Sequence, residues 1–129
     1  MTYNTPINIF TGIVKRIGAN HYAKTGLGWV DIRIIKNFPS NKSNTISFKG
    51  SKLTIPCRNE FLHALEEIFI DEIYKLNLEE KATIIDCGAN IGLSILYLKR
   101  QTPTAHIIAF EPDEKNFSIL EKNIHLINY

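Results

Sequence analysis

The chain has 129 residues, of which 44% are hydrophobic and 22% charged, and its formal net charge is +2 at pH 7. This length suits one domain, and a compact chain of this size buries roughly two-thirds of its unfolded surface. No apolar run approaches the ~20 residues that a membrane-spanning helix needs. The N-terminus also lacks the basic segment and apolar core of a signal peptide. We therefore expect a cytoplasmic protein without stable membrane insertion.

Charge is divided unevenly along the chain. Residues 1–58 contain nine Lys and Arg against one acid, Asp31, whereas residues 59–129 contain six bases against twelve acids. This division suggests two functional regions. The basic region could meet an anionic substrate, a nucleic acid or a membrane surface. Its bases are spread out and are not interleaved with aromatic residues, so we favour docking against the acidic part or solvation, and no nucleic-acid partner.

The first half of the chain predicts a helix, a strand and a hairpin. Residues 5–17 keep helical spacing of apolar side chains, beginning with Thr-Pro, a pair typical of helix starts. Residues 19–44 are irregular in pattern and allow one strand at 28–35. Apolar and polar residues then alternate on both sides of Lys49-Gly50, which predicts a small β-hairpin over 45–56.

The second half predicts a long helix followed by alternating strands and helices. The helix covers 59–76, and its apolar side chains share one face: Phe61, Leu65, Ile68, Phe69, Ile73 and Leu76. Strands are expected at 83–87 and 105–110, each followed by a helix, at 91–100 and at 116–128 with Asp113 as N-cap. This order predicts parallel strands joined by right-handed crossovers. We place a region boundary between residues 80 and 81.

The turn after the first of these strands contains the main functional signal. Gly88 allows a sharp turn and close approach of a ligand, and Gly92 permits tight contact where the next helix starts. The free N–H groups of that helix start suit an anionic group. Glu111 ends the second strand 23 positions after Gly88 (111 − 88). An acid at about that distance can bind the two hydroxyls of an adenosine ribose.

The spacing of the glycines helps to distinguish a dinucleotide from S-adenosylmethionine as the cofactor. A dinucleotide fingerprint is G-x-G-x-x-G, but here the spacing is Gly88-x-x-x-Gly92, with Asn90 near the place of the middle glycine. Asp86, two residues before the first glycine, would repel a pyrophosphate and favour a ligand carrying an ammonium and a sulfonium. These features favour S-adenosylmethionine. A nicotinamide-dependent oxidoreductase remains the less favoured alternative.

Two segments together resemble the cofactor-binding half of FkbM-type S-adenosylmethionine-dependent methyltransferases. They are "IIDCGANIGLSILYLK" and "AHIIAFEPDEKNFSILEKNI", which contain the tandem motifs D-x-G-A-N-x-G and A-F-E-P-D. The helix before the first strand is similar as well, so the resemblance covers residues 59–128. It implies an α/β, Rossmann-like class I methyltransferase fold, truncated after the second strand–helix unit and preceded by a small α+β N-terminal region.

The resemblance also implies the cofactor-binding residues. The first motif, which wraps the methionine end of the cofactor, corresponds to Asp86, Gly88, Ala89, Asn90 and Gly92. Asn90 would bond the cofactor or cap the helix beginning near residue 91. Glu111 matches the ribose-binding acid, and Pro112 shapes the loop beneath the adenine. Glu67 and Tyr74 lie in the preceding helix, which in such folds can close over the cofactor; alternatively they are a solvated acid and a partly buried aromatic.

Other reactive residue types form no recognisable catalytic set. The cysteines, Cys57 and Cys87, have neither metal-type nor redox-type spacing, so we expect reduced, partly buried thiols. The four histidines are unpaired in spacing, and we interpret His106 and His125 as structural. We expect no metal site, and the sequence identifies no catalytic base.

The chain ends directly after the second helix, so we expect a partial protein in which the acceptor site is missing. By resemblance the parent enzyme methylates an oxygen, on a sugar or glycan-type hydroxyl of a small-molecule or glycan acceptor. The alternative is a fragment that binds cofactor weakly or serves as an interaction module without catalysis. A homo-oligomer is compatible with the sequence.

Overall fold

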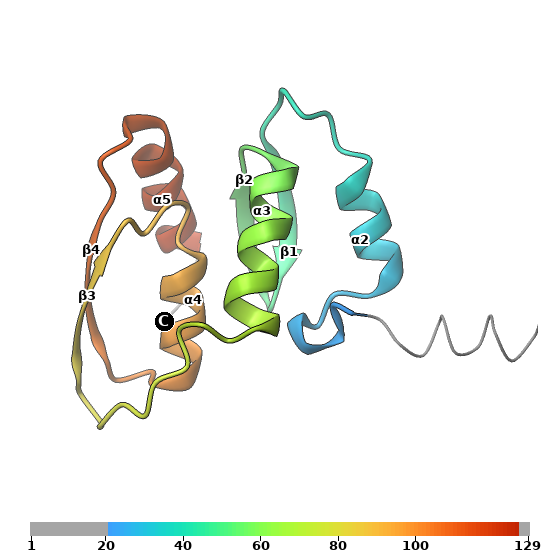
Figure 1. Cartoon of the computed structure of the whole chain (residues 1–129). Helices are drawn as coiled ribbons and strands as arrows, with labels where there is room; N and C mark the ends of the chain where they lie inside the picture. Colours follow the sequence, from blue (N-terminus) through green and yellow to red (C-terminus); the bar gives the residue numbers. More distant parts are fainter. Residues whose placement is uncertain (1–20, 127–129) are drawn as a thin grey trace, which may run out of the picture.

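The computed structural model describes residues 21–126, and the helix expected at 5–17 lies outside them. The described part is a small α/β protein with four α-helices and two small sheets (Figure 1). Its N-terminal end holds the 3₁₀ turn η1 (Ala23–Thr25), helix α2 (Trp29–Lys36) and the strands β1 (Asn44–Phe48) and β2 (Ser51–Ile55). None of the helices in this part is long and apolar enough to cross a membrane.

The β-hairpin expected at 45–56 is confirmed. β1 and β2 pair antiparallel, with Asn44 opposite Ile55 and Phe48 opposite Ser51. The two turn residues, Lys49 and Gly50, have φ angles of 51° and 86°. Positive φ at both central positions suits the right-handed twist of the flanking strands.

The strand expected at 28–35 is wrong, because this segment forms helix α2. The carboxylate of Asp31 accepts a hydrogen bond of 2.8 Å from the backbone N–H of Gly28 and so fixes the helix start. Ile32 and Ile35 are buried, as helical spacing requires. β-Branched residues favour strands only weakly, so the cap and the burial of this stripe outweigh their preference.

The helix expected at 59–76 is confirmed at its start but ends early. Helix α3 (Arg58–Leu65) continues into a π-helical turn, η2 (Glu66–Ile70), and residues 71–76 are not helical. The N–H of Asp71 bonds the carbonyl of Glu66 at 3.0 Å, five residues back. This wider turn shifts the following residues off the apolar face. Ile73 and Leu76, expected on that face, are therefore exposed.

The alternating strands and helices are confirmed. Strand β3 (Thr83–Cys87) pairs in parallel with β4 (His106–Phe110), with Asp86 opposite Ala109. Helix α4 (Leu93–Gln101) connects them and α5 (Glu114–Leu126) follows β4. Asp113 caps α5 as expected, since its Oδ1 accepts a 2.9 Å hydrogen bond from the N–H of Asn116.

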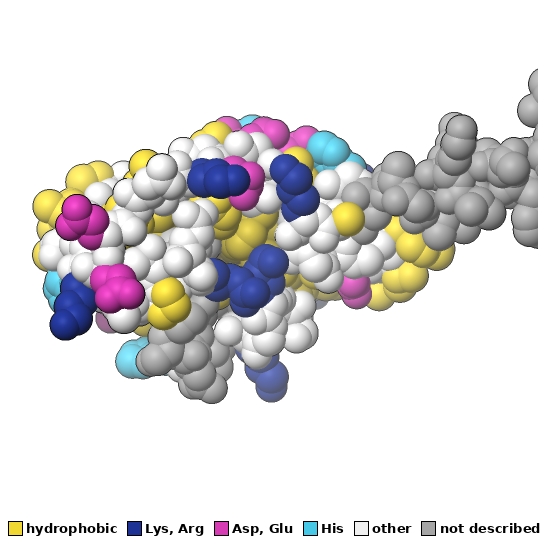
Figure 2. Space-filling view, turned by 90° about the horizontal axis from the view of Figure 1, so that it is seen from below, with side chains coloured by type: hydrophobic (Ala, Val, Ile, Leu, Met, Phe, Trp, Pro, Cys, Tyr) yellow, Lys and Arg dark blue, Asp and Glu magenta, His cyan; other side chains and the backbone are white. Residues whose placement is uncertain are grey.

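Both helices cover the same face of the β3–β4 sheet (Figure 1). The outer face carries exposed apolar side chains, those of Ile85, Ile108 and Phe110. Figure 2, a view from below, accordingly shows hydrophobic side chains at the end of the molecule that carries β3 and β4. A parallel sheet is usually covered on both faces, so this sheet is half of the usual layered arrangement.

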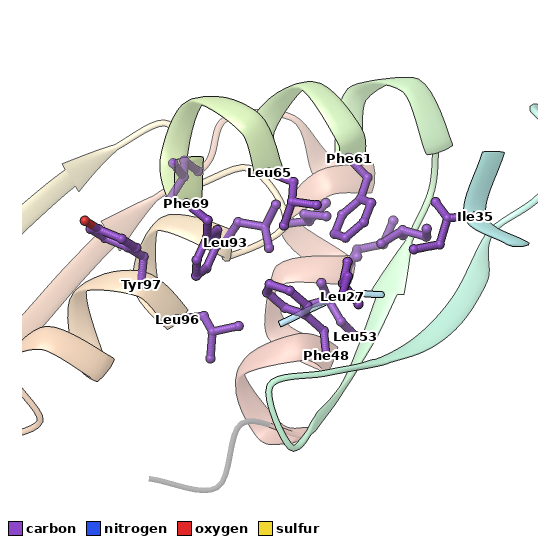
Figure 3. Packing of buried hydrophobic residues seen from close by; sticks show 14 of the residues in the cluster. Leu27, Ile35, Phe48, Leu53, Phe61, Leu65, Phe69, Leu93, Leu96 and Tyr97 are labelled. Carbon is purple, nitrogen blue, oxygen red and sulfur yellow. The ribbon is translucent and has the colours of Figure 1, made fainter. Parts of the chain in front are cut away.

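The larger of two hydrophobic core clusters in the described part crosses the expected region boundary at 80/81. Phe48 of β1 packs edge-on against Phe61 and Phe69, and Phe69 packs edge-on against Tyr97 of α4, with ring centroids 5.2–6.2 Å apart. Figure 3 shows these rings around Leu65 and Leu96. The π-helical turn η2, which continues α3, is therefore packed directly on α4, and Phe48 joins the hairpin to the same cluster.

Candidate functional site

The glycine loop lies at the carboxyl end of β3 and is bonded to the end of β4. The N–H groups of Gly88 and Ala89 both donate to the carbonyl of Phe110, at 2.8 and 2.9 Å. Gly88 and Gly92 have φ angles of 100° and 93°, a region that side chains with a Cβ rarely adopt. A Cβ added at Gly88 would meet nothing within 4 Å, so the backbone here faces open space.

Asp86 is buried beneath this loop, with 7% of its surface exposed. Its Oδ2 accepts a hydrogen bond of 2.6 Å from the hydroxyl of Ser94, in the first turn of α4. The carboxylate thus ties the end of β3 to the start of α4. Ser94 was not predicted as a site residue, because a serine inside a helical pattern gives no signal until the fold places it against a buried acid.

Glu111 joins the two strand ends. Its Oε2 accepts a 2.8 Å hydrogen bond from the N–H of Asn90, and its Oε1 accepts one of 2.9 Å from the N–H of Asp113. A carboxylate has about four lone-pair positions, so each oxygen retains capacity for a further donor. The side chain is half-buried, fixed in direction and still able to accept two hydroxyl groups.

A hollow of about 160 Å³ lies between the glycine loop and α3–η2; we call it the acidic hollow. Glu67 and Tyr74 line it together with Gly88, Ala89 and Asn90. The fold therefore brings these predicted residues together. Its charged lining residues are Glu60 and Glu67, both acidic, which suits a cationic ligand.

A second hollow of about 490 Å³ lies on the other side of the loop; we call it the strand-end hollow. It is lined by Cys87, Gly88, Phe110, Glu111 and Pro112. Gly88 lines both hollows. The predicted site residues thus divide into two groups that meet at Gly88, except for Asp86 below the loop and Gly92 at the start of α4, which line neither hollow.

Asn90 does not cap α4, and that part of the prediction is wrong. The helix begins at Leu93, its N-cap is Gly92, and no side chain caps it. Asn90 has a φ of 47°, and its backbone N–H is held by Glu111. The left-handed turn delays the helix by about two residues, so Asn90 is left in the loop beside the acidic hollow.

Several lining residues were not predicted. Pro56 and Cys57, just before α3, and Phe61 and Ala64, within α3, line the acidic hollow. They lie more than twenty positions before the glycine loop, and only the packing of the α3–η2 segment, through η2, on α4 brings them to the site. Both cysteines are free. Cys57 is half-buried as expected, but the expected burial of Cys87 is wrong, because this residue is exposed at the end of β3.

No histidine of the described residues lines either hollow, although His63 approaches Glu67 of the acidic hollow. His106 and His125 are exposed, whereas His21 and His63 approach Glu66 and Glu67 at 2.7 and 3.4 Å. Among the residues that the structure describes, no group of three or more His, Cys, Asp or Glu could hold a metal ion.

The described chain is thus a small α/β protein with a glycine loop and an acid at adjacent carboxyl ends of parallel strands. Comparison with known proteins gives partial similarity to methyltransferases. The chain is 43% identical over 70 residues to Methyltransferase 1 of Beauveria bassiana, a segment that is 54% of this chain and 27% of that protein. It is 47% identical over 62 residues to Methyltransferase sdnD of Sordaria araneosa, covering 47% of this chain and 24% of the fungal protein.

A third similarity is to a much larger bacterial protein. The chain is 44% identical over 57 residues to the AMB antimetabolite synthetase AmbE of Pseudomonas aeruginosa, which is 42% of this chain and 3% of AmbE. No family model and no solved structure matches the chain. The chain therefore spans about a quarter of the length of the two fungal methyltransferases it matches.

Proposed function

We propose that this chain is the cofactor-binding part of an S-adenosylmethionine-dependent methyltransferase with a Rossmann-like class I fold. The observation that carries the proposal is the meeting of the acidic and strand-end hollows at Gly88. The partial similarity to two fungal methyltransferases supports the same class. Within the methyltransferases, the resemblance of the two sequence motifs to FkbM-type enzymes favours that family.

The acidic hollow suits the methionine end of the cofactor. S-adenosylmethionine carries an ammonium and a sulfonium there, and the glutamates at 60 and 67 supply negative charge. The absent Cβ of Gly88 leaves space for close backbone approach. In this proposal Tyr74 contributes an aromatic wall, and Asp86 holds the loop in shape through Ser94.

The strand-end hollow suits the adenosine. Glu111 has accepting positions left for two ribose hydroxyls, and Phe110 and Pro112 offer apolar surface for the base. All charged residues lining the two hollows are acidic, which disfavours the pyrophosphate of a nicotinamide dinucleotide. This charge distribution therefore favours the methyltransferase over the oxidoreductase.

The bound cofactor would supply a methyl group on a sulfonium, and the protein would mainly hold donor and acceptor in line. By the FkbM-type resemblance, we propose an oxygen acceptor on a sugar or glycan-type hydroxyl. The acceptor site and the catalytic base then belong to the whole enzyme rather than to the hollows described above.

The test is a calorimetric titration with S-adenosylhomocysteine, its 2′-deoxyribose analogue and NAD. We expect S-adenosylhomocysteine to bind and NAD not to bind. Loss of the 2′-hydroxyl should weaken binding by about ten- to a hundredfold, since a hydrogen bond to a charged group contributes about 1.5–3 kcal/mol. Binding of NAD without binding of the homocysteine compound would refute the methyltransferase proposal.

Glu111→Ala supplies the control for the ribose contact. This variant also removes the bonds to the N–H groups of Asn90 and Asp113, so its overall affinity alone is ambiguous. The informative quantity is the ratio between the dissociation constants of S-adenosylhomocysteine and its 2′-deoxyribose analogue, measured for each protein. We expect the variant to bind the ribose and deoxyribose compounds equally; an unchanged ratio would rule out the ribose contact.

A further inference from the structure

A third hollow, of about 330 Å³, lies at the carboxyl end of α4, and we call it the cationic hollow. Its lining residues come from η1, the hairpin turn, η2 and its following loop, and α4: Lys24, Lys49, Phe69, Glu72, Tyr97, Arg100 and Gln101. It shares no lining residue with the acidic or the strand-end hollow. Figure 2 shows Lys and Arg side chains around a recess floored by hydrophobic side chains.

Three cations from separate segments converge on this hollow. The ammonium of Lys24 donates to the carbonyl of Ile70 at 3.2 Å, and a guanidinium nitrogen of Arg100 donates to the carbonyl of Lys49 at 3.4 Å. The ammonium of Lys49 lies 5.4 Å from the centroid of the Phe69 ring. In residues 21–126 none of these three cations forms an ion pair with an acid.

The one acid of the lining is already engaged. Glu72 pairs with Lys75 at 3.1 Å and accepts a hydrogen bond of 3.5 Å from the hydroxyl of Tyr97. These contacts and the charge of Lys24 lower the pKa of Glu72, the bond to Lys75 contributing most. Three bases against one acid leave the lining with a net charge of +2.

Holding these cations together is unfavourable without an anion. Burial, and after it the charge of Arg100, lowers the pKa of Lys49, because both disfavour the protonated form. The ring of Phe69 offsets part of this cost through its negative face. A ligand with two negative charges would relieve the remaining repulsion.

We propose that the cationic hollow binds a small organic phosphate. The fork of Arg100 and the two ammonium groups match the oxygens of a phosphate dianion. The ring of Phe69 forms an apolar floor for the organic part. A volume of 330 Å³ falls within the about 300–1,000 Å³ of small-molecule pockets and exceeds what a bare phosphate fills.

The test is an NMR and calorimetric titration of the full chain with phenyl phosphate, inorganic phosphate and phenol. We expect phenyl phosphate to bind most tightly and phenol not to bind. Shifts should be confined to signals of the cationic hollow, including the backbone amides of Lys49 and Arg100. Equal affinity for inorganic and phenyl phosphate, or no saturable shift at these residues, would overturn the proposal.

Variants separate a built site from general charge attraction. Arg100→Gln and Lys49→Gln should each weaken phenyl phosphate binding about tenfold, since each removes a charged donor. Lys52→Gln is the matched control, because Lys52 is exposed on the same hairpin and does not line the hollow. Circular dichroism checks that each variant is folded, and the exposed Arg100 provides a second variant if Lys49→Gln does not fold. Equal weakening by Lys52→Gln would refute the site.

Discussion

Asn123 is a buried amide that connects three separate segments. From α5 its Oδ1 accepts a 2.7 Å hydrogen bond from the N–H of Thr54, and its Nδ2 donates to the carbonyls of Thr54 at 3.0 Å and Ile91 at 2.8 Å. Its side chain is fully buried. The amide thus completes the backbone pairing of β2 and holds the residue just before Gly92. A buried polar side chain with every partner in place fixes a specific packing.

We expect Asn123→Ala to lower the free energy of unfolding by about 3 kcal/mol, because it leaves buried backbone groups without partners. Asn59→Ala is the matched control, since Asn59 is an exposed residue of α3. Its effect should stay within about 0.5 kcal/mol. Urea denaturation measures both values. Hydrogen exchange at the Thr54 amide should accelerate only in Asn123→Ala; unchanged exchange there would contradict the role of the amide.

At the scale of elements, the start of α4 depends on two glycines with different surroundings. Both have positive φ, so an alanine at either position is strained. A Cβ at Gly92 would also lie 3.0 Å from Cδ1 of Leu120 on α5, whereas a Cβ at Gly88 meets nothing within 4 Å. Gly92 is therefore needed for packing of α4 on α5, and Gly88 for the shape of the two hollows that meet at it.

We expect Gly92→Ala to destabilise the protein by about 1–3 kcal/mol from backbone strain and by more from the contact with Leu120. Gly88→Ala should cost only the strain, but it should weaken S-adenosylhomocysteine binding because its methyl group enters the ligand space. Thermal unfolding and calorimetry of the two variants make the comparison. A larger loss of stability in Gly88→Ala would contradict this assignment.

At the scale of the whole molecule, one core cluster connects the part of the chain before residue 80 with the β3–α4–β4–α5 unit. Phe48 and Phe69 lie before residue 80, and Leu96 and Tyr97 lie after it, yet all four belong to one buried cluster. Neither part would bury enough apolar surface alone. The two parts are therefore expected to unfold together.

Trp29 is the single tryptophan of the chain and lies on α2, so its fluorescence reports on the N-terminal part. We expect its urea midpoint to coincide with that of far-ultraviolet circular dichroism. Leu96→Ala, in α4, should cost about 2–5 kcal/mol and shift the Trp29 transition by the same amount. A Trp29 midpoint unaffected by this variant would indicate two independently folding regions, divided near residue 80.

Local sequence patterns were sufficient to predict the structure where each residue's conformation depends mainly on its neighbours in the chain. The alternation around Lys49-Gly50 determined the hairpin, and the glycines at 88 and 92 determined the turn after β3. Glu111 was predicted as a site residue because it stands at the end of a predicted strand. Because carboxyl ends of parallel strands meet at one sheet edge, the sequence also predicted that these residues would be neighbours.

Long-range packing decided the rest. Residues 29–36 carry a β-branched run that local preference assigns to a strand, but the Asp31 cap and a buried stripe make it helical. The bond between Asp86 and Ser94, the Asn123 contacts and the cationic hollow join residues that have no fixed spacing in sequence. The sequence by itself determined the hairpin, the two parallel strands and the glycine loop between strand and helix. Only the tertiary structure decided which side chains line the hollows, because a contact between distant segments depends on how whole elements pack and not on any local pattern.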